Sequence, residues 1–98
     1  MSTHFVAWNF KPEVKEEDKP ALKAAMKTNL DALVGKVPGL LTCTFIDSPL
    51  PGSNREIGLI STHATPEDVA AYLIDPIHNA AADEFVRPFT CDRTSFNW

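Results

Sequence analysis

The sequence predicts an α+β fold with the element order β-α-β-β-α-β, and three observations lead to this prediction. Apolar residues alternate with a period of two in four short segments, as they do in strands. Two longer segments repeat apolar residues every three or four positions, which is typical of helices. Clusters of Pro, Gly, Ser and Asn separate the segments. With right-handed crossovers, this order folds as a ferredoxin-like antiparallel sheet with both helices on one face.

The bulk composition limits the classes of protein to consider. The 98 residues are expected to form a single domain over residues 1–98, with 44% apolar and 22% charged residues, as in ordinary globular proteins. A net charge of −4 without a basic cluster argues against nucleic acid or an anionic membrane as a partner. The apolar runs are too short to span a bilayer, and residues 1–10 lack an export signal. We therefore expect a cytoplasmic protein.

The first strand is expected over residues 4–11, where apolar side chains occur on both faces. One face carries His4, Val6, Trp8 and Phe10. The other carries Phe5, Ala7 and Asn9. A helix is then expected from near Asp18 to residue 34, because Pro20 is tolerated only in a first turn. Its apolar stripe consists of Leu22, Met26, Leu30, Leu33 and Val34. Gly35 is a plausible stop for this helix, and residues 37–39 form a turn.

Two more strands are expected over residues 40–47 and 56–63, with a loop over residues 48–54 between them. The strand over residues 40–47 should direct Leu41, Cys43 and Phe45 to one face. The strand over residues 56–63 should direct Ile57 and Leu59 to one face, opposite Gly58 and Ile60. Cys43 and Cys91 fit no metal or redox spacing, so both are expected to be reduced and partly buried, and no metal site is predicted.

The second helical region is expected in two segments that meet at Asp75-Pro76. The first segment begins at Thr65-Pro66, a capping residue followed by proline, and turns Val69, Tyr72 and Leu73 inward. The second segment begins with Pro76 and continues to about residue 86. Its apolar stripe consists of Ile77, Ala81 and Phe85. A last strand is expected over residues 94–98, with Phe96 and Trp98 on one face and Ser95 and Asn97 on the other.

The junction at Asp75-Pro76 places an imidazole at the start of a helix. Asp75 is expected to cap the helix, which makes His78 its third residue, at the positive end of the helix dipole. The dipole and partial burial both disfavour imidazolium, whereas the carboxylate of Asp75 favours it. Because the capping oxygens already accept backbone N–H groups, we expect His78 to be mostly neutral at pH 7. A half-buried structural histidine, satisfied by backbone or by Asn97, would fit the same pattern.

The open face of the sheet predicts self-association. Helices are sufficient to cover only one face, and the alternation directs Phe5, Phe96 and Trp98 together to the other. Apolar patches of this size are rarely left in water. A homodimer formed through this face is therefore expected.

Four stretches of the sequence resemble the stress-responsive dimeric α/β barrel (Dabb) family. They are HFVAWNFK at residues 4–11, VPG at 37–39, YLIDPIH at 72–78 and SFNW at 95–98. The resemblance extends over nearly the whole chain. It implies a homodimer whose sheets pack face to face, with a pocket between the sheet and the helices of each subunit.

The resemblance also implies site residues, through polyketide cyclases of the olivetolic acid cyclase type, which use neither a metal nor an organic cofactor. In that group a histidine of a Pro-x-His motif is the general base, and a tyrosine and a first-strand histidine line the pocket. By motif, these positions are His78, Tyr72 and His4. The acid that orients the base corresponds to Asn97, which can accept a hydrogen bond but cannot stabilise imidazolium by charge. Asp75 is a second departure, since the family often has histidine there.

Three functions are compatible with the sequence. The first is a homodimer whose pocket binds a small apolar or aromatic ligand, with proton transfer of a cyclase or lyase type and no cofactor. Its catalytic residues would be His78, Tyr72 and His4. Its ligand-binding residues would be Val6, Trp8, Leu73 and Asn97. The alternatives are a non-catalytic stress-responsive dimer and a cofactor-free monooxygenase-like enzyme. His63, at the end of the third strand, is expected to lie near His4.

Overall fold

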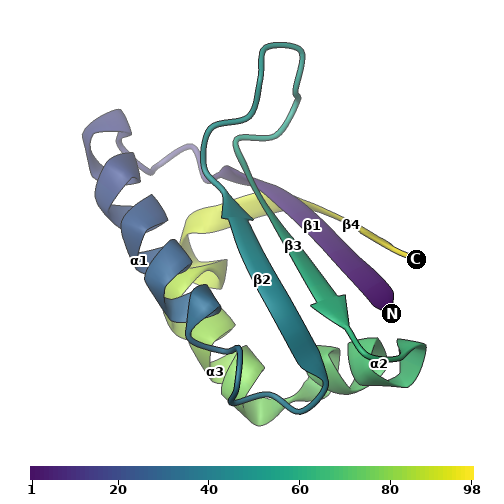
Figure 1. Cartoon of the computed structure of the whole chain (residues 1–98). Coiled ribbons are helices and arrows are strands. Elements are labelled where there is room, and N and C mark those ends of the chain that lie inside the picture. Colours follow the sequence, from purple (N-terminus) through teal and green to yellow (C-terminus); the bar gives the residue numbers. More distant parts are fainter.

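The computed structural model describes residues 1–98 and has the predicted order of elements (Figure 1). The strands are β1 (Ser2–Phe10), β2 (Leu40–Ile46), β3 (Ile57–His63) and β4 (Thr90–Asn97). The α-helices are α1 (Lys19–Asp31), α2 (Pro66–Ile74) and α3 (Pro76–Phe85). Short 3-10 helices, η1 (Glu16–Asp18) and η2 (Arg87–Phe89), precede α1 and β4. The fold is α+β with ferredoxin-like topology, as predicted.

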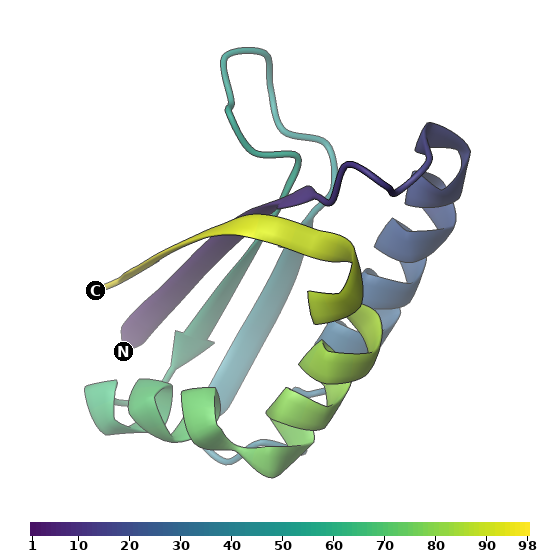
Figure 2. The same cartoon turned by 180° about the vertical axis from the view of Figure 1, so that it is seen from behind.

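The sheet is antiparallel and has the strand order β2-β3-β1-β4. Helices α1 and α3 lie next to each other on one side of it, and the other side is uncovered (Figures 1 and 2). The two termini lie close together, because the backbones of Thr3 and Trp98 exchange hydrogen bonds of 2.7 and 2.9 Å. The predicted loop after β2 extends beyond the end of the sheet. None of the helices combines the length and apolar character needed to cross a membrane.

The core lies between the helices and the covered face of the sheet. Alternate residues of a strand share a face, and the predicted faces of β1 and β3 are confirmed by burial. Thirteen buried hydrophobic residues form one cluster: Val6, Trp8, Phe10, Met26, Leu30, Leu33, Val37, Leu40, Phe45, Ile57, Leu59, Tyr72 and Val86. Burial of this cluster holds the helices on the sheet, since apolar area removed from water is the main stabilising contribution.

Two apolar residues do not lie on the faces predicted for them, because the chain departs from ideal periodicity near them. Leu41 is 48% exposed while Leu40 is buried, because the register of β2 against β3 shifts between Leu40 and Thr42. Such a bulge inserts one residue and reverses the faces beyond it. Val34 is 41% exposed, because α1 ends at Asp31 and the following residues form turns.

Two further expectations, in the second half of the chain, also need correction. Ile77 is 46% exposed, and the buried stripe of α3 includes Ala82, one position beyond the predicted Ala81. The last strand begins at Thr90, four residues before the predicted start, because Asp92 has a φ of 54° and interrupts the alternation. The register of β1 against β4 shifts at this point.

The capping predictions for α2 and α3 are confirmed. The side chain of Thr65 accepts a hydrogen bond of 3.2 Å from the backbone N–H of Asp68. Asp75 Oδ1 accepts hydrogen bonds from the backbone N–H groups of Ile77, at 2.8 Å, and His78, at 3.1 Å. These bonds satisfy donors that lack a partner in the first turn, and each cap stabilises its helix by about 1 kcal/mol.

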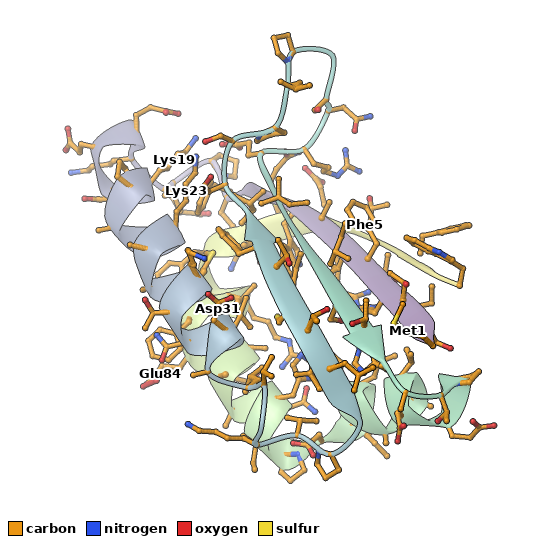
Figure 3. The ribbon with its side chains drawn as sticks, in the orientation of Figure 1. Met1, Phe5, Lys19, Lys23, Asp31 and Glu84 are labelled. Carbon is orange, nitrogen blue, oxygen red and sulfur yellow. The ribbon has the colours of Figure 1, made fainter.

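Large apolar side chains gather on the uncovered face of the sheet. Phe96 and Trp98 are 67% and 63% exposed, with their ring centroids 5.8 Å apart. Phe5 lies opposite Phe96 in the register of β1 and β4. In Figure 3, the residues Lys19 and Asp31 are labelled on α1, and Phe5 lies on the side of the sheet away from that helix. The predicted open apolar face is therefore present.

Candidate functional site

A pocket of about 390 Å³ lies between the sheet and helices α2 and α3. Its volume falls within the range of small-molecule sites in proteins, ~300–1,000 Å³. Hydrophobic side chains make up most of the wall, among them Val6 and Trp8 of β1, Leu59 of β3 and Leu73 of α2. The pocket therefore suits a ligand with an apolar body.

Tyr72 lies fully buried beside this pocket, among three imidazoles. Its ring stacks on His78 with 3.9 Å between centroids, and it lies 5.8 Å from His4 and 5.0 Å from His63. The Tyr72 hydroxyl has no hydrogen-bond partner within the chain. Burial raises the pKa of this phenol, so the hydroxyl keeps its proton and remains a hydrogen-bond donor.

His78 reaches the pocket from the first turn of α3, held there by the Asp75 cap. Burial lowers the pKa of His78 to about 4, although the backbone carbonyl of Tyr72 acts in the opposite direction. The positive charge of Arg87 lowers this pKa further, and Asp75 raises it only weakly. His78 is therefore neutral at pH 7, in agreement with the expectation from sequence. Its buried Nδ1 atom has no partner within the chain.

Asn97 pairs with His4 and not with His78, which corrects the expectation from the resemblance. Asn97 Oδ1 lies 2.5 Å from His4 Nδ1. The two residues are direct neighbours across β1 and β4, whereas His78 belongs to a helix. With the amide oxygen as acceptor, Nδ1 of His4 donates and Nε2 is left as an acceptor in the neutral ring. Burial lowers the pKa of His4, the Asn97 bond opposes this, and Arg93 lowers it further.

Of the other predicted site residues, three line the pocket and one does not. Val6, Trp8 and Leu73 line the pocket together with His4, Tyr72 and His78. Asn97 does not line it and instead borders a neighbouring groove with Trp98. It is connected to the pocket only through His4.

His63 forms a support behind Tyr72 and is not part of the pocket wall. It is fully buried, and its Nε2 atom lies 2.9 Å from Ser61 Oγ. Burial lowers the pKa of His63, and proximity to His4 lowers it further, as the expected closeness of the two histidines implies. A neutral His63 edge-on to Tyr72 restrains the tyrosine ring.

Sequence reasoning missed two arginines of the pocket, Arg87 and Arg93. Arg87 begins η2, and Val86 separates it from Phe85, the last residue of α3. Arg93 lies within β4, but the last strand was expected to begin one residue later, at Thr94. Had the strand been extended by one residue, the period-two pattern would have placed Arg93 on the same face as Asn97.

No group of three or more His, Cys, Asp or Glu side chains is arranged to hold a metal ion. Both cysteines are free, and burial raises the pKa of Cys43 to about 11. A thiol with such a pKa is almost entirely protonated at pH 7 and is a poor nucleophile. The polar groups able to act on a ligand are therefore the imidazoles, the phenol and the guanidinium groups.

Comparison with solved structures supports the same fold. A dimeric protein of unknown function with a ferredoxin-like fold from Bacteroides fragilis is 23% identical, with a TM-score of 0.86, over 99% of this chain and 93% of that chain. A Dabb family protein from Mesorhizobium loti is 14% identical, with a TM-score of 0.73 and coverage of 99% and 93%. A putative antibiotic biosynthesis monooxygenase from Nitrosomonas europaea is 19% identical, with a TM-score of 0.70 and coverage of 100% and 96%.

Sequence comparison assigns the family. No protein with curated annotation matches this chain. The model of the stress-responsive A/B barrel domain, Dabb, matches residues 3–98. This match includes every helix and strand of the fold except the first residue of β1, and so includes the elements that build the pocket. The chain therefore belongs to the stress-responsive A/B barrel domain (Dabb) family.

Proposed function

We propose that the protein is a homodimer in which each subunit binds a small organic ligand beside Tyr72 and His78 and transfers a proton from it. One observation carries this proposal: the Tyr72 hydroxyl and His78 Nδ1 are both buried at one pocket without a partner in the chain. A buried polar atom without a partner is costly in a native protein. A ligand that accepts from the phenol and gives a proton to the imidazole would satisfy both.

The proposed reaction removes a proton from a carbon next to a carbonyl group. Neutral His78 takes the proton as the C–H bond breaks, and the Tyr72 hydroxyl donates a hydrogen bond to the enolate oxygen that forms. In a cyclase, the carbanion adds to a second carbonyl of the same molecule, and the resulting alkoxide takes the proton from the imidazolium. In a lyase, the carbanion expels a leaving group, which receives the proton. No electron acceptor is needed for either reaction.

The low pKa of His78 restricts the substrate. An imidazole whose pKa lies near 4 is a weak base, so it removes protons efficiently only from strongly acidified carbon. A methylene group between two carbonyls meets this requirement, and an isolated ketone does not. We therefore propose a 1,3-dicarbonyl compound with an apolar body as the substrate class.

The dimer would cover the open face of the sheet. Phe5, Phe96 and Trp98 form an apolar surface there, and the similar protein from Bacteroides fragilis is dimeric. Two such faces packed together would remove these rings from water. The pocket lies on the opposite side of the sheet, so dimerisation leaves it open.

Deuterium exchange tests the chemistry. The methylene protons of ethyl benzoylacetate, followed by NMR in deuterium oxide, should exchange faster with the protein than in buffer alone. His78→Gln should abolish the acceleration, and Tyr72→Phe should reduce it by about 100-fold, the loss typical of one oxyanion donor. Circular dichroism should show that both variants remain folded. Exchange at the buffer rate with the unaltered protein would remove the catalytic proposal.

Two alternatives give different results in parallel assays. A non-catalytic dimer would show no exchange and no saturable ligand binding. A monooxygenase would consume oxygen with a quinol substrate. The similarity to the Nitrosomonas europaea protein, at 19% identity, extends only to the fold.

A further inference from the structure

The charges around the pocket are unbalanced. Its polar side chains are two imidazoles, one phenol and the guanidinium groups of Arg87 and Arg93, and no carboxylate lines it. This contrasts with the chain as a whole, which carries a net charge of −4. Because Arg87 is paired with Asp83, the guanidinium group of Arg93 is the uncompensated charge at this apolar pocket, and it creates a local positive potential that favours an anionic ligand.

The two arginines differ in what they already bind. Arg87 donates to Asp83 Oδ1 at 2.6 Å and to Asn79 Oδ1 at 2.9 Å, so partners within the chain occupy its guanidinium group. Arg93 takes part in none of the ion pairs or side-chain hydrogen bonds of the chain. Arg93 is exposed, and it therefore lies where the pocket opens to solvent.

Arg93 lies on the pocket side of β4, next to a bulge. The register of β1 and β4 pairs Ala7 with Thr94 and Asn9 with Cys91, so Asp92 and Arg93 together lie opposite a single residue. Asp92 adopts a φ of 54°, an uncommon conformation outside glycine. Bulges of this kind often occur beside sites. Here the bulge shifts the register beyond Arg93, which keeps the pocket side that it shares with Ser95 and Asn97.

The bulge is held in place from the other side of the sheet. The side chain of Asn9 donates to Asp92 Oδ2 at 3.1 Å. Arg55 donates to the backbone carbonyl of Asp92 at 2.8 Å and to Thr94 Oγ1 at 3.0 Å. These bonds fix Asp92 away from the pocket and leave Arg93 on the pocket side, without a carboxylate beside it to neutralise its charge.

We infer that the ligand of this pocket is a carboxylate with an apolar body, and that Arg93 binds its carboxylate at the opening. This inference rests on the proposed ligand-binding function. A guanidinium group presents two parallel N–H donors that match the two oxygens of a carboxylate. The electrostatic effect of Arg93 on His4 supports the placement, since it puts the cation near the β1 side of the pocket. The carboxylate would then lie beside β1 and β4, with the ligand body directed towards Tyr72 and His78.

Calorimetric titration with 2-naphthoate and 2-naphthamide tests the inference, because the two probes share one apolar body and differ in charge. The unaltered protein should bind the naphthoate about tenfold more tightly or better, since a hydrogen bond to a charged group contributes about 1.5–3 kcal/mol and every 1.4 kcal/mol is tenfold. Arg93→Gln should remove this preference, because it should lower the affinity for the naphthoate far more than the affinity for the amide. Arg93→Lys keeps the charge and should keep most of the preference.

Lys36→Gln is the matched control, because it removes one positive charge from an exposed turn away from the pocket. It should leave both affinities as they are. Equal affinity for the two probes would overturn the inference and leave the apolar pocket intact. A preference for naphthoate that survives in Arg93→Gln would overturn the role of Arg93. Failure of both probes to bind the unaltered protein would overturn the ligand-binding function and this inference with it.

Discussion

The protonation of His78 should make the fold less stable in mild acid. Burial lowers the pKa of His78 to about 4, whereas an unfolded chain gives histidine a pKa of about 6.5. Between these two values the unfolded chain binds a proton that the folded chain does not. Stability therefore rises with pH through this window: the contribution of His78 is complete above about pH 6.5 and is lost as the pH falls towards 4.

The pKa difference sets the size of the effect. A pKa difference of one corresponds to about 1.4 kcal/mol, so the whole difference of about 2.5 would be worth roughly 3.5 kcal/mol. Between pH 7 and pH 5 slightly more than half of this, about 1.8 kcal/mol, would be lost. His78 is only half-buried and keeps some contact with solvent, so we expect roughly 1 kcal/mol.

Urea denaturation at pH 7 and pH 5 measures this loss, at one fixed protein concentration because dimerisation would also stabilise the fold. His78→Gln is neutral at both pH values and is the reference. Burial also lowers the pKa values of His4 and His63, and their contributions cancel in the difference between the two proteins. Between pH 7 and pH 5, the free energy of unfolding of the unaltered protein should fall by about 1 kcal/mol more than that of the variant. Identical pH dependence of the two would refute a neutral, buried His78.

Three further predictions concern assembly and local structure. Light scattering should give about twice the mass of one chain, and a monomer at micromolar concentration would contradict the open-face dimer. Trp98→Ala should weaken the dimer by about 3 kcal/mol, which is more than 100-fold in Kd. Asp75→Ala should cost about 1 kcal/mol in urea denaturation, because it removes the cap of α3, and an unchanged midpoint would contradict this. Gly39→Ala should destabilise the fold by at least about 1 kcal/mol more than Gly35→Ala, because both have positive φ but only the former places a methyl group against the Asp68 carboxylate. Equal losses for the two glycines would exclude that contact.

The sequence by itself determined the features that depend on local order. Period-two alternation predicted β1 and β3 with their correct faces, because successive side chains of a strand point to opposite sides. Thr65-Pro66 and Asp75-Pro76 predicted the starts of α2 and α3, because a cap acts within its own turn. Since Asp75 also positions His78, the sequence located one half of the site before the fold was known.

Tertiary structure alone decided the features that depend on pairing between distant segments. The bulge at Leu41 appears only when β2 is aligned with β3, and the bulge at Asp92 only when β4 is aligned with β1. Asn97 bonds His4 because these two residues are neighbours across the sheet, 93 positions apart in sequence. Arg93, in contrast, lies on the face that simple alternation along β4 gives it, and only the start of the strand was misplaced. The register between strands is set by the balance of contacts over the whole sheet, and no local pattern in the sequence contains it.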